Sequence, residues 1–123
     1  VMLQLRPHIS PDDYLPRVHR MMETERYHLL AGCENGVVRA VAGFRYMDML
    51  YCGRILYVDD LITDEAARSS GWGARLMDWL RWRAEAEGCD QLHLDSGVHR
   101  PGAHRFYFRH GMSITAFHFA MPL

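Results

Sequence analysis

Apolar residues recur along the chain with two different spacings, which predict helices and strands in a definite order. Residues 10–13 (Ser-Pro-Asp-Asp) have the hydroxyl, proline and acidic groups of a helix start, and apolar positions at helical spacing follow them. Shorter runs at residues 27–33, 37–46 and 54–63 are typical of strands, and Asn35-Gly36 between the first two is typical of a tight hairpin. The sequence therefore predicts a helix followed by an antiparallel three-stranded meander.

The second half of the chain is predicted to alternate helix and strand. Apolar residues at positions i, i+3, i+4 and i+7 indicate a helix from about residue 71 to 87, which Gly88 ends. We expect a strand over residues 91–95, a helix over 102–110 and a last strand over 113–120. A strand, a helix and a strand in this order imply a parallel pair joined by a right-handed crossover. The predicted fold class is therefore α/β (α+β type), with a mixed, mostly antiparallel sheet and flanking helices.

The composition agrees with one globular domain over residues 1–123. Hydrophobic residues make up 49% and charged residues 24%, and a formal net charge of -1 argues against a nucleic-acid partner. No apolar run reaches the roughly 20 residues of a membrane span, so we expect no membrane partner. All 14 basic residues are arginine, which excludes a lysine-dependent phosphate loop or Schiff base. The three widely spaced cysteines form no disulfide or zinc pattern, and we expect them to be buried in a cytoplasmic protein.

The most informative stretch is a glycine-rich helix start at residues 68–74, Arg-Ser-Ser-Gly-Trp-Gly-Ala, which follows a predicted strand. Unpaired N–H groups collect at such a start, and glycine lets a phosphate approach the backbone. One interpretation is a diphosphate held by these amides and by Arg68. A tight turn that binds nothing is equally consistent with the spacing. A Rossmann motif is excluded, because Leu76 stands where its third glycine belongs.

These residues resemble a known family. Residues 68–73 are similar to the Arg/Gln-x-x-Gly-x-Gly/Ala signature of the GNAT superfamily of N-acetyltransferases. Residues 103–112 are similar to its Ala-x-x-x-Tyr-x-x-x-Gly-Phe segment, with methionine last, and residues 61–63 stand where it usually has Leu-x-Val on a splayed strand. The resemblance implies a GNAT-like fold with a splayed parallel pair. It also implies an acetyl-CoA-dependent acyltransferase that moves acetyl to a small-molecule or peptide amine by direct attack.

The resemblance further implies which residues bind acetyl-CoA. The backbone amides that would hold its diphosphate belong to Arg68, Ser69, Ser70, Gly71, Trp72, Gly73 and Ala74. The backbone of Leu61, Ile62 and Thr63 would pair with the pantetheine arm. An N–H near Leu61 would then polarise the thioester carbonyl.

Three side chains are the candidate catalytic residues. Tyr107 occupies the family position of the acid that protonates the departing thiolate; its alternative is a core aromatic between Phe106 and Phe108. Asp59 and Asp60 are the candidates for the base, which an amine with a pKa of about 10 requires. Strand alternation would point their side chains to opposite faces. Their structural alternative is one solvated carboxylate and one ion pair with an arginine.

Two features bear on partners and on an alternative to an enzyme. Trp72, Trp79 and Trp82 form a stripe that either packs on the sheet or contributes to a homodimer contact. Family members usually have a strand and a helix before the meander, so we expect a shortened N-terminal part here. Residues 1–6 are either the first strand or, as we favour, the tail of a helix that ends before Pro7. A CoA-binding regulatory or interaction module without catalysis is therefore the second hypothesis.

The histidines between residues 93 and 118 match no compact ligand motif, so we expect no metal.

Overall fold

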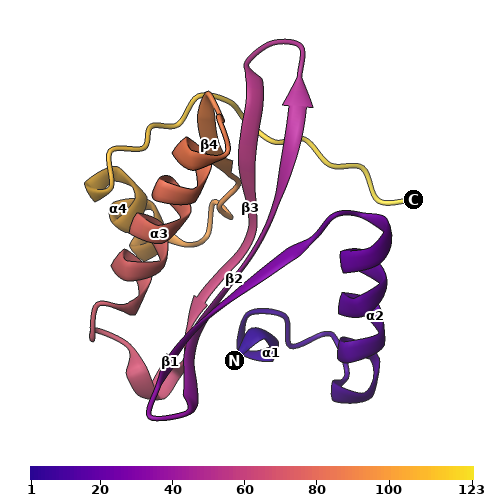
Figure 1. The fold of residues 1–123 in the computed structure, drawn as a ribbon, viewed down its shortest axis with the longest axis vertical. Helices are drawn as coiled ribbons and strands as arrows, with labels where there is room; N and C mark the ends of the chain where they lie inside the picture. Colours follow the sequence, from indigo (N-terminus) through magenta and orange to yellow (C-terminus); the bar gives the residue numbers. More distant parts are fainter.

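The computed structural model describes residues 1–123 and arranges them in three layers, with helices on both faces of a sheet (Figure 1). In chain order the elements are α1 (Met2–Leu5), α2 (Pro11–Thr24), β1 (His28–Glu34), β2 (Val37–Met49), β3 (Gly53–Thr63), the 3-10 helix η1 (Glu65–Ala67), α3 (Trp72–Ala86), β4 (Gln91–Leu94) and α4 (Pro101–Arg109). The sheet has the order β1-β2-β3-β4. The first three strands are antiparallel and β4 is parallel to β3, which confirms the predicted mixed sheet.

Local signals in the sequence set where the first elements begin and turn. The Ser10 hydroxyl caps α2 by accepting a hydrogen bond from the Asp13 amide at 3.2 Å. Asn35 and Gly36 have φ angles of 51° and 75°, as the tight turn between β1 and β2 requires. The helix expected near the N-terminus is present as α1 and ends before Pro7.

The main core lies between α3 and the sheet. Its buried members come from β2, β3 and α3 and are Ala40, Ala42, Phe44, Leu56, Val58, Trp72, Leu76, Met77, Leu80 and Ala84. Trp72 is buried and Trp79 contacts Phe44 of β2 edge-on, whereas Trp82 is 57% exposed, so the tryptophan stripe packs on the sheet at its first two positions. Alternation along the strands places Val41 and Ile55 on the opposite face, which α1 and α2 cover (Figure 1).

The predicted last strand over residues 113–120 is wrong. This segment has no regular secondary structure, and Phe117 and Phe119 are 82% and 93% exposed. Apolar side chains along an extended chain satisfy a strand pattern locally, but a strand also needs a neighbour for its backbone hydrogen bonds. The last of the four strands in the sheet, β4, is only four residues long, and the segment does not pair with it.

The expectation of buried cysteines is also wrong. Cys33 is exposed, because it lies on the edge strand β1 next to the hairpin turn. Cys52 and Cys89 are half-buried, in the turn between β2 and β3 and just after α3. None of the helices has the length and apolar character of a membrane-spanning segment.

Candidate active site

The N-terminus of α3 presents a run of free backbone amides. Gly71 precedes the helix with a φ of 82°, and no side chain caps it. The first helical bond runs from the Arg75 N–H to the Gly71 carbonyl at 3.1 Å, so the N–H groups of residues 72–74 have no helical partner. A Cβ on Gly71 would meet nothing within 4 Å. The predicted phosphate cradle is therefore open to an anion, and its residues fit a diphosphate.

The strand that leads to this helix start separates from its parallel neighbour. β3 and β4 pair over four positions, the last of which joins Val58 to Leu94. Residues 59–63 of β3 therefore have no strand on the β4 side. This is the splayed parallel pair that the family resemblance implied.

The open edge of β3 carries backbone groups of particular residues. A hydrogen bond from the Asp64 N–H to the Arg39 carbonyl, at 2.7 Å, fixes the phase of the alternating bonds between β2 and β3. In that phase Ile62 bonds to β2, whereas Leu61 and Thr63 direct their N–H and C=O groups to the open edge. An extended ligand can pair with this edge as a strand would.

A β-bulge turns two consecutive carboxylates toward one cavity. Asp60 pairs with Gly43 and Val58 pairs with Phe44, so Asp59 is an extra residue on β3. Both aspartates line the same cavity. The prediction that they point to opposite faces is wrong, because the bulge interrupts the strand alternation on which it depended.

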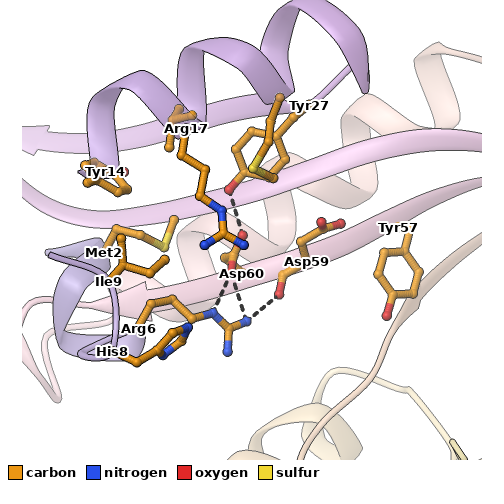
Figure 2. Close-up of a pocket in the computed structure, with 12 residues that line it drawn as sticks. Met2, Arg6, His8, Ile9, Tyr14, Arg17, Tyr27, Tyr57, Asp59 and Asp60 are labelled. Carbon is orange, nitrogen blue, oxygen red and sulfur yellow. Dashed lines mark hydrogen bonds and ion pairs between the residues drawn. The ribbon is translucent and has the colours of Figure 1, made fainter. Parts of the chain in front are cut away.

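The cavity has a volume of about 350 Å³ and lies between α1, α2 and β3 (Figure 2). Besides the two aspartates, its polar and aromatic walls include Arg6, His8, Tyr14, Arg17, Tyr27 and Tyr57. Of the residues that line the cavity, only the two aspartates were predicted from the sequence. The other residues come from segments that folding brings together, and the one available signal was the helical spacing that places Tyr14 and Arg17 on neighbouring turns of α2.

Each carboxylate of the bulge is held by an arginine. Asp59 accepts hydrogen bonds from Nε of Arg45, at 3.1 Å, and from its Nη2. Asp60 accepts from Nε of Arg6 at 2.9 Å and from the Tyr27 hydroxyl at 2.7 Å. Burial raises the pKa of Asp59 above its usual value, and the hydrogen bonds from Arg45 oppose that shift. Both carboxylates are therefore ion-paired, and the solvated carboxylate of the structural alternative is not observed.

The Tyr27 hydroxyl reaches Asp60 by lying directly over Gly43. A Cβ on Gly43 would lie 1.6 Å from the Tyr27 hydroxyl oxygen, so this position of β2 requires glycine. Burial, and next the hydrogen bond to Asp60, raise the pKa of the Tyr27 phenol far above its usual value. The phenol therefore stays protonated at neutral pH and remains the donor to Asp60.

Tyr107 is half-buried on α4 and lies outside the cavity of the two aspartates. Its ring contacts Phe106 edge-on, with centroids 5.4 Å apart. The Phe106 ring in turn lies 3.3 Å from where a Cβ on Gly73 would be, so α4 packs against the start of α3. Burial raises the pKa of Tyr107 and keeps its proton in place at neutral pH, as an acid requires.

The late histidines make separate local contacts. His118 lies 3.4 Å from the Asp95 carboxylate, and His104 lies 2.8 Å from the Gly97 carbonyl. No three His, Cys, Asp or Glu side chains come together in an arrangement that would hold a metal ion.

The chain is similar to known proteins along almost its whole length. The sequence model of the Acetyltransferase (GNAT) family matches residues 3–112. A Bacillus subtilis (strain 168) protein named "Uncharacterized N-acetyltransferase YhdJ" is 33% identical over 124 residues, which cover 100% of this chain and 87% of that protein.

Solved structures share the fold at lower sequence identity. A transcriptional regulator from Bacillus halodurans C-125 matches with a TM-score of 0.83 and 24% identity, over 92% of this chain and 77% of that one. A ribosomal-protein-alanine N-acetyltransferase from Brucella melitensis biovar Abortus 2308 matches with a TM-score of 0.78 and 17% identity, over 93% and 82% of the two chains. On the family match and on the 33% identical relative, this chain belongs to the GNAT family of acetyltransferases.

Proposed function

We propose that this chain transfers the acetyl group of acetyl-CoA to a primary amine, which attacks the thioester directly. Family membership supports acetyl transfer to an amine in general and implies acetyl-CoA as the co-substrate, which supplies the acetyl thioester. One observation carries the proposal: the open amides at the start of α3 follow the uncovered edge of β3 in the chain, with only η1 and a short loop between them. That edge leads back to the bulge at Asp59 and so to the cavity.

The binding residues act mainly through their backbones. The amides of residues 68–74, with the exposed Arg68 side chain beside them, bind the diphosphate. The outward groups of Leu61 and Thr63 pair with the pantetheine arm, and the Leu61 N–H donates to the carbonyl oxygen as negative charge develops on it. Ile62, whose backbone bonds to β2, is left to contact the arm with its side chain.

We assign the two proton transfers to Asp59 and Tyr107. The new N–C bond forms as the C–S bond breaks; Asp59 accepts the proton that the amine loses, and Tyr107 gives its proton to the thiolate. Each Asp59 oxygen keeps a lone pair beyond its bond to Arg45, and a raised pKa makes this carboxylate a better proton acceptor. Asp60, engaged by Arg6 and Tyr27, positions the bulge.

The ion pairs of both carboxylates also favour a second candidate function. A CoA-binding regulatory or interaction module would keep the open amides and the free edge of β3 but would need no free base. Release of free thiol from acetyl-CoA with a panel of amines, together with isothermal titration of acetyl-CoA, separates the two functions. We expect binding and amine-dependent thiol release. Binding without release for every amine indicates the module, and absence of binding refutes both.

The acid role of Tyr107 has a direct test. Tyr107→Phe keeps the ring but removes the proton, so turnover is expected to fall by about hundredfold while the acetyl-CoA Kd stays within about twofold. The matched control is Tyr51→Phe, at an exposed tyrosine between β2 and β3. Turnover that is unchanged in Tyr107→Phe removes this residue from the mechanism.

A further inference from the structure

One arginine that lines the cavity between α1, α2 and β3 has no carboxylate partner. Three guanidinium groups lie at the cavity or the bulge, those of Arg6, Arg17 and Arg45, against the two carboxylates of Asp59 and Asp60. Arg6 and Arg45 are paired with Asp60 and Asp59. Arg17 lines the cavity but forms no ion pair and no side-chain hydrogen bond, so one positive charge is left over.

Other charged groups of α2 do not neutralise Arg17. Asp13, one turn earlier, makes no ion pair with it; its carboxylate accepts a hydrogen bond from the Ser10 hydroxyl at 2.8 Å. Arg20, one turn later, adds a further positive charge outside the cavity, beside a groove that also touches Asp13 and Arg17. His8 also lines the cavity.

The two kinds of charge come from different walls. Arg17 extends from α2 toward the cavity, whereas Asp59 and Asp60 belong to β3 (Figure 2). Apolar side chains, among them Ile9 and Val18, complete the lining. A volume of about 350 Å³ lies at the small end of the range for small-molecule sites, roughly 300–1,000 Å³. The cavity therefore has room for a small molecule with a cationic and an anionic end.

We propose that the acceptor is a small amine that also carries a carboxylate or phosphate group, which Arg17 binds. The proposal rests on the proposed acetyl transfer to an amine and names the acceptor class of that same site. A guanidinium forms two parallel hydrogen bonds with either anion, and such charge-assisted pairs are among the stronger polar contacts. The amine end then lies toward the carboxylates of β3. A polycationic amine offers Arg17 no anionic partner, and the positive charge of Arg17 repels it.

The first experiment compares matched amines in the thiol-release assay with the full chain. Glycine, β-alanine and 4-aminobutanoate are each paired with their carboxamide, and 2-aminoethyl phosphate is paired with ethanolamine. We expect kcat/KM to be at least about tenfold higher for the charged member of the best pair. The amine of a carboxamide is the less basic, so more of it is unprotonated at neutral pH, which makes the amino-acid pairs stringent. The two arms identify whether carboxylate or phosphate is preferred.

The second experiment changes Arg17 itself. Arg17→Gln should raise KM for the charged amine by about ten- to hundredfold, with kcat and the acetyl-CoA Kd nearly unchanged. The matched control is Arg20→Gln, on the same helix but outside the cavity. Both variants should keep the melting temperature, because neither arginine forms an ion pair within the chain. The neutral partner amines should react equally with all three proteins.

The possible results separate this inference from the proposed function. Equal rates for charged and neutral amines, or an unchanged KM in Arg17→Gln, overturn the inference and leave acetyl transfer intact. Thiol release with none of the amines refutes the proposed function instead. In that case, calorimetric titration of the same amines into the CoA-bound protein decides the inference without turnover. Binding of the acidic amines that Arg17→Gln abolishes supports it, and absence of binding overturns it.

Discussion

Two neighbouring parts of this molecule are suited to charged ligands by different means. The start of α3 offers backbone amides that no side chain covers. The cavity between α1, α2 and β3 depends on side chains from distant segments, such as Arg6 and Asp60, which are 54 positions apart. A backbone site is set by local conformation, so many sequences can form it, whereas a side-chain site depends on each residue. We therefore expect mutations to separate the two: one part determines acetyl-CoA binding and the other determines use of the amine.

The largest expected effect is on the amine side. Asp59→Asn removes the proposed proton acceptor, so kcat/KM for the amine should fall by about hundredfold, while the acetyl-CoA Kd stays within about twofold. In the wild type, turnover should fall on acidification as Asp59 is protonated, at a pH above the usual range because burial raises its pKa. The pH profile of thiol release measures both effects.

Two further variants control this prediction. Asp48→Asn, at an exposed position of β2, should leave turnover unchanged. Asp60→Asn tests which of the two carboxylates is the base. If Asp59→Asn turned over as fast as the wild type and only Asp60→Asn lost turnover, Asp60 would be the base.

The next effect is on the cofactor side. Gly71→Val places a β-branched residue at a φ of 82° in front of the free amides, so the loop must rearrange. Loss of one charge-assisted hydrogen bond to the diphosphate corresponds to an acetyl-CoA Kd about thirtyfold higher by isothermal titration. Gly88→Val is the matched control, because Gly88 has a φ of 71° and equally open surroundings after the other end of α3. Equal losses of binding in both variants would mean that strain, and not the amides, is responsible.

The same contrast explains what the sequence could predict. The open helix start at residues 71–74 was predictable, because glycine spacing and the start of a helix are local properties. The cavity was not, since the bulge at Asp59 exists only in the pairing of β3 with β2, and one extra residue redirects a side chain. The strand predicted over residues 113–120 was wrong for a related reason. The alternation of its residues is a local property, but the strand that it would need as a partner is not. Local sequence signals were therefore enough to predict most helices and strands, whereas the pairing of the strands determines how the side chains of the cavity are placed.

The glycine under Tyr27 tests how tightly the cavity wall is packed. Gly43→Ala places a methyl group 1.6 Å from the Tyr27 hydroxyl oxygen, so the ring must move and lose its bond to Asp60. We expect the free energy of unfolding to fall by about 2 kcal/mol in urea denaturation. Gly102→Ala, whose added Cβ would lie 3.8 Å from its nearest neighbour in α4, should not lower it. Equal stability of the two variants would show that the Tyr27 ring can move without lowering the free energy of unfolding.

The smallest effect concerns the phenolic proton of Tyr27, which the hydroxyl donates to Asp60 in a hydrogen bond. The phenol has a pKa of about 10 in the unfolded chain and a raised pKa in the folded chain, so above pH 10 the native state binds one proton more. Stability from this residue is complete below pH 10 and should decline above it by about 1.4 kcal/mol per pH unit. Tyr27→Phe should lower the free energy of unfolding by a constant amount between pH 7 and about 9, and should then flatten the alkaline decline. Parallel curves for the two proteins above pH 10 would mean that the Tyr27 proton is not held by the fold, and that Asp60 is positioned by Arg6 alone.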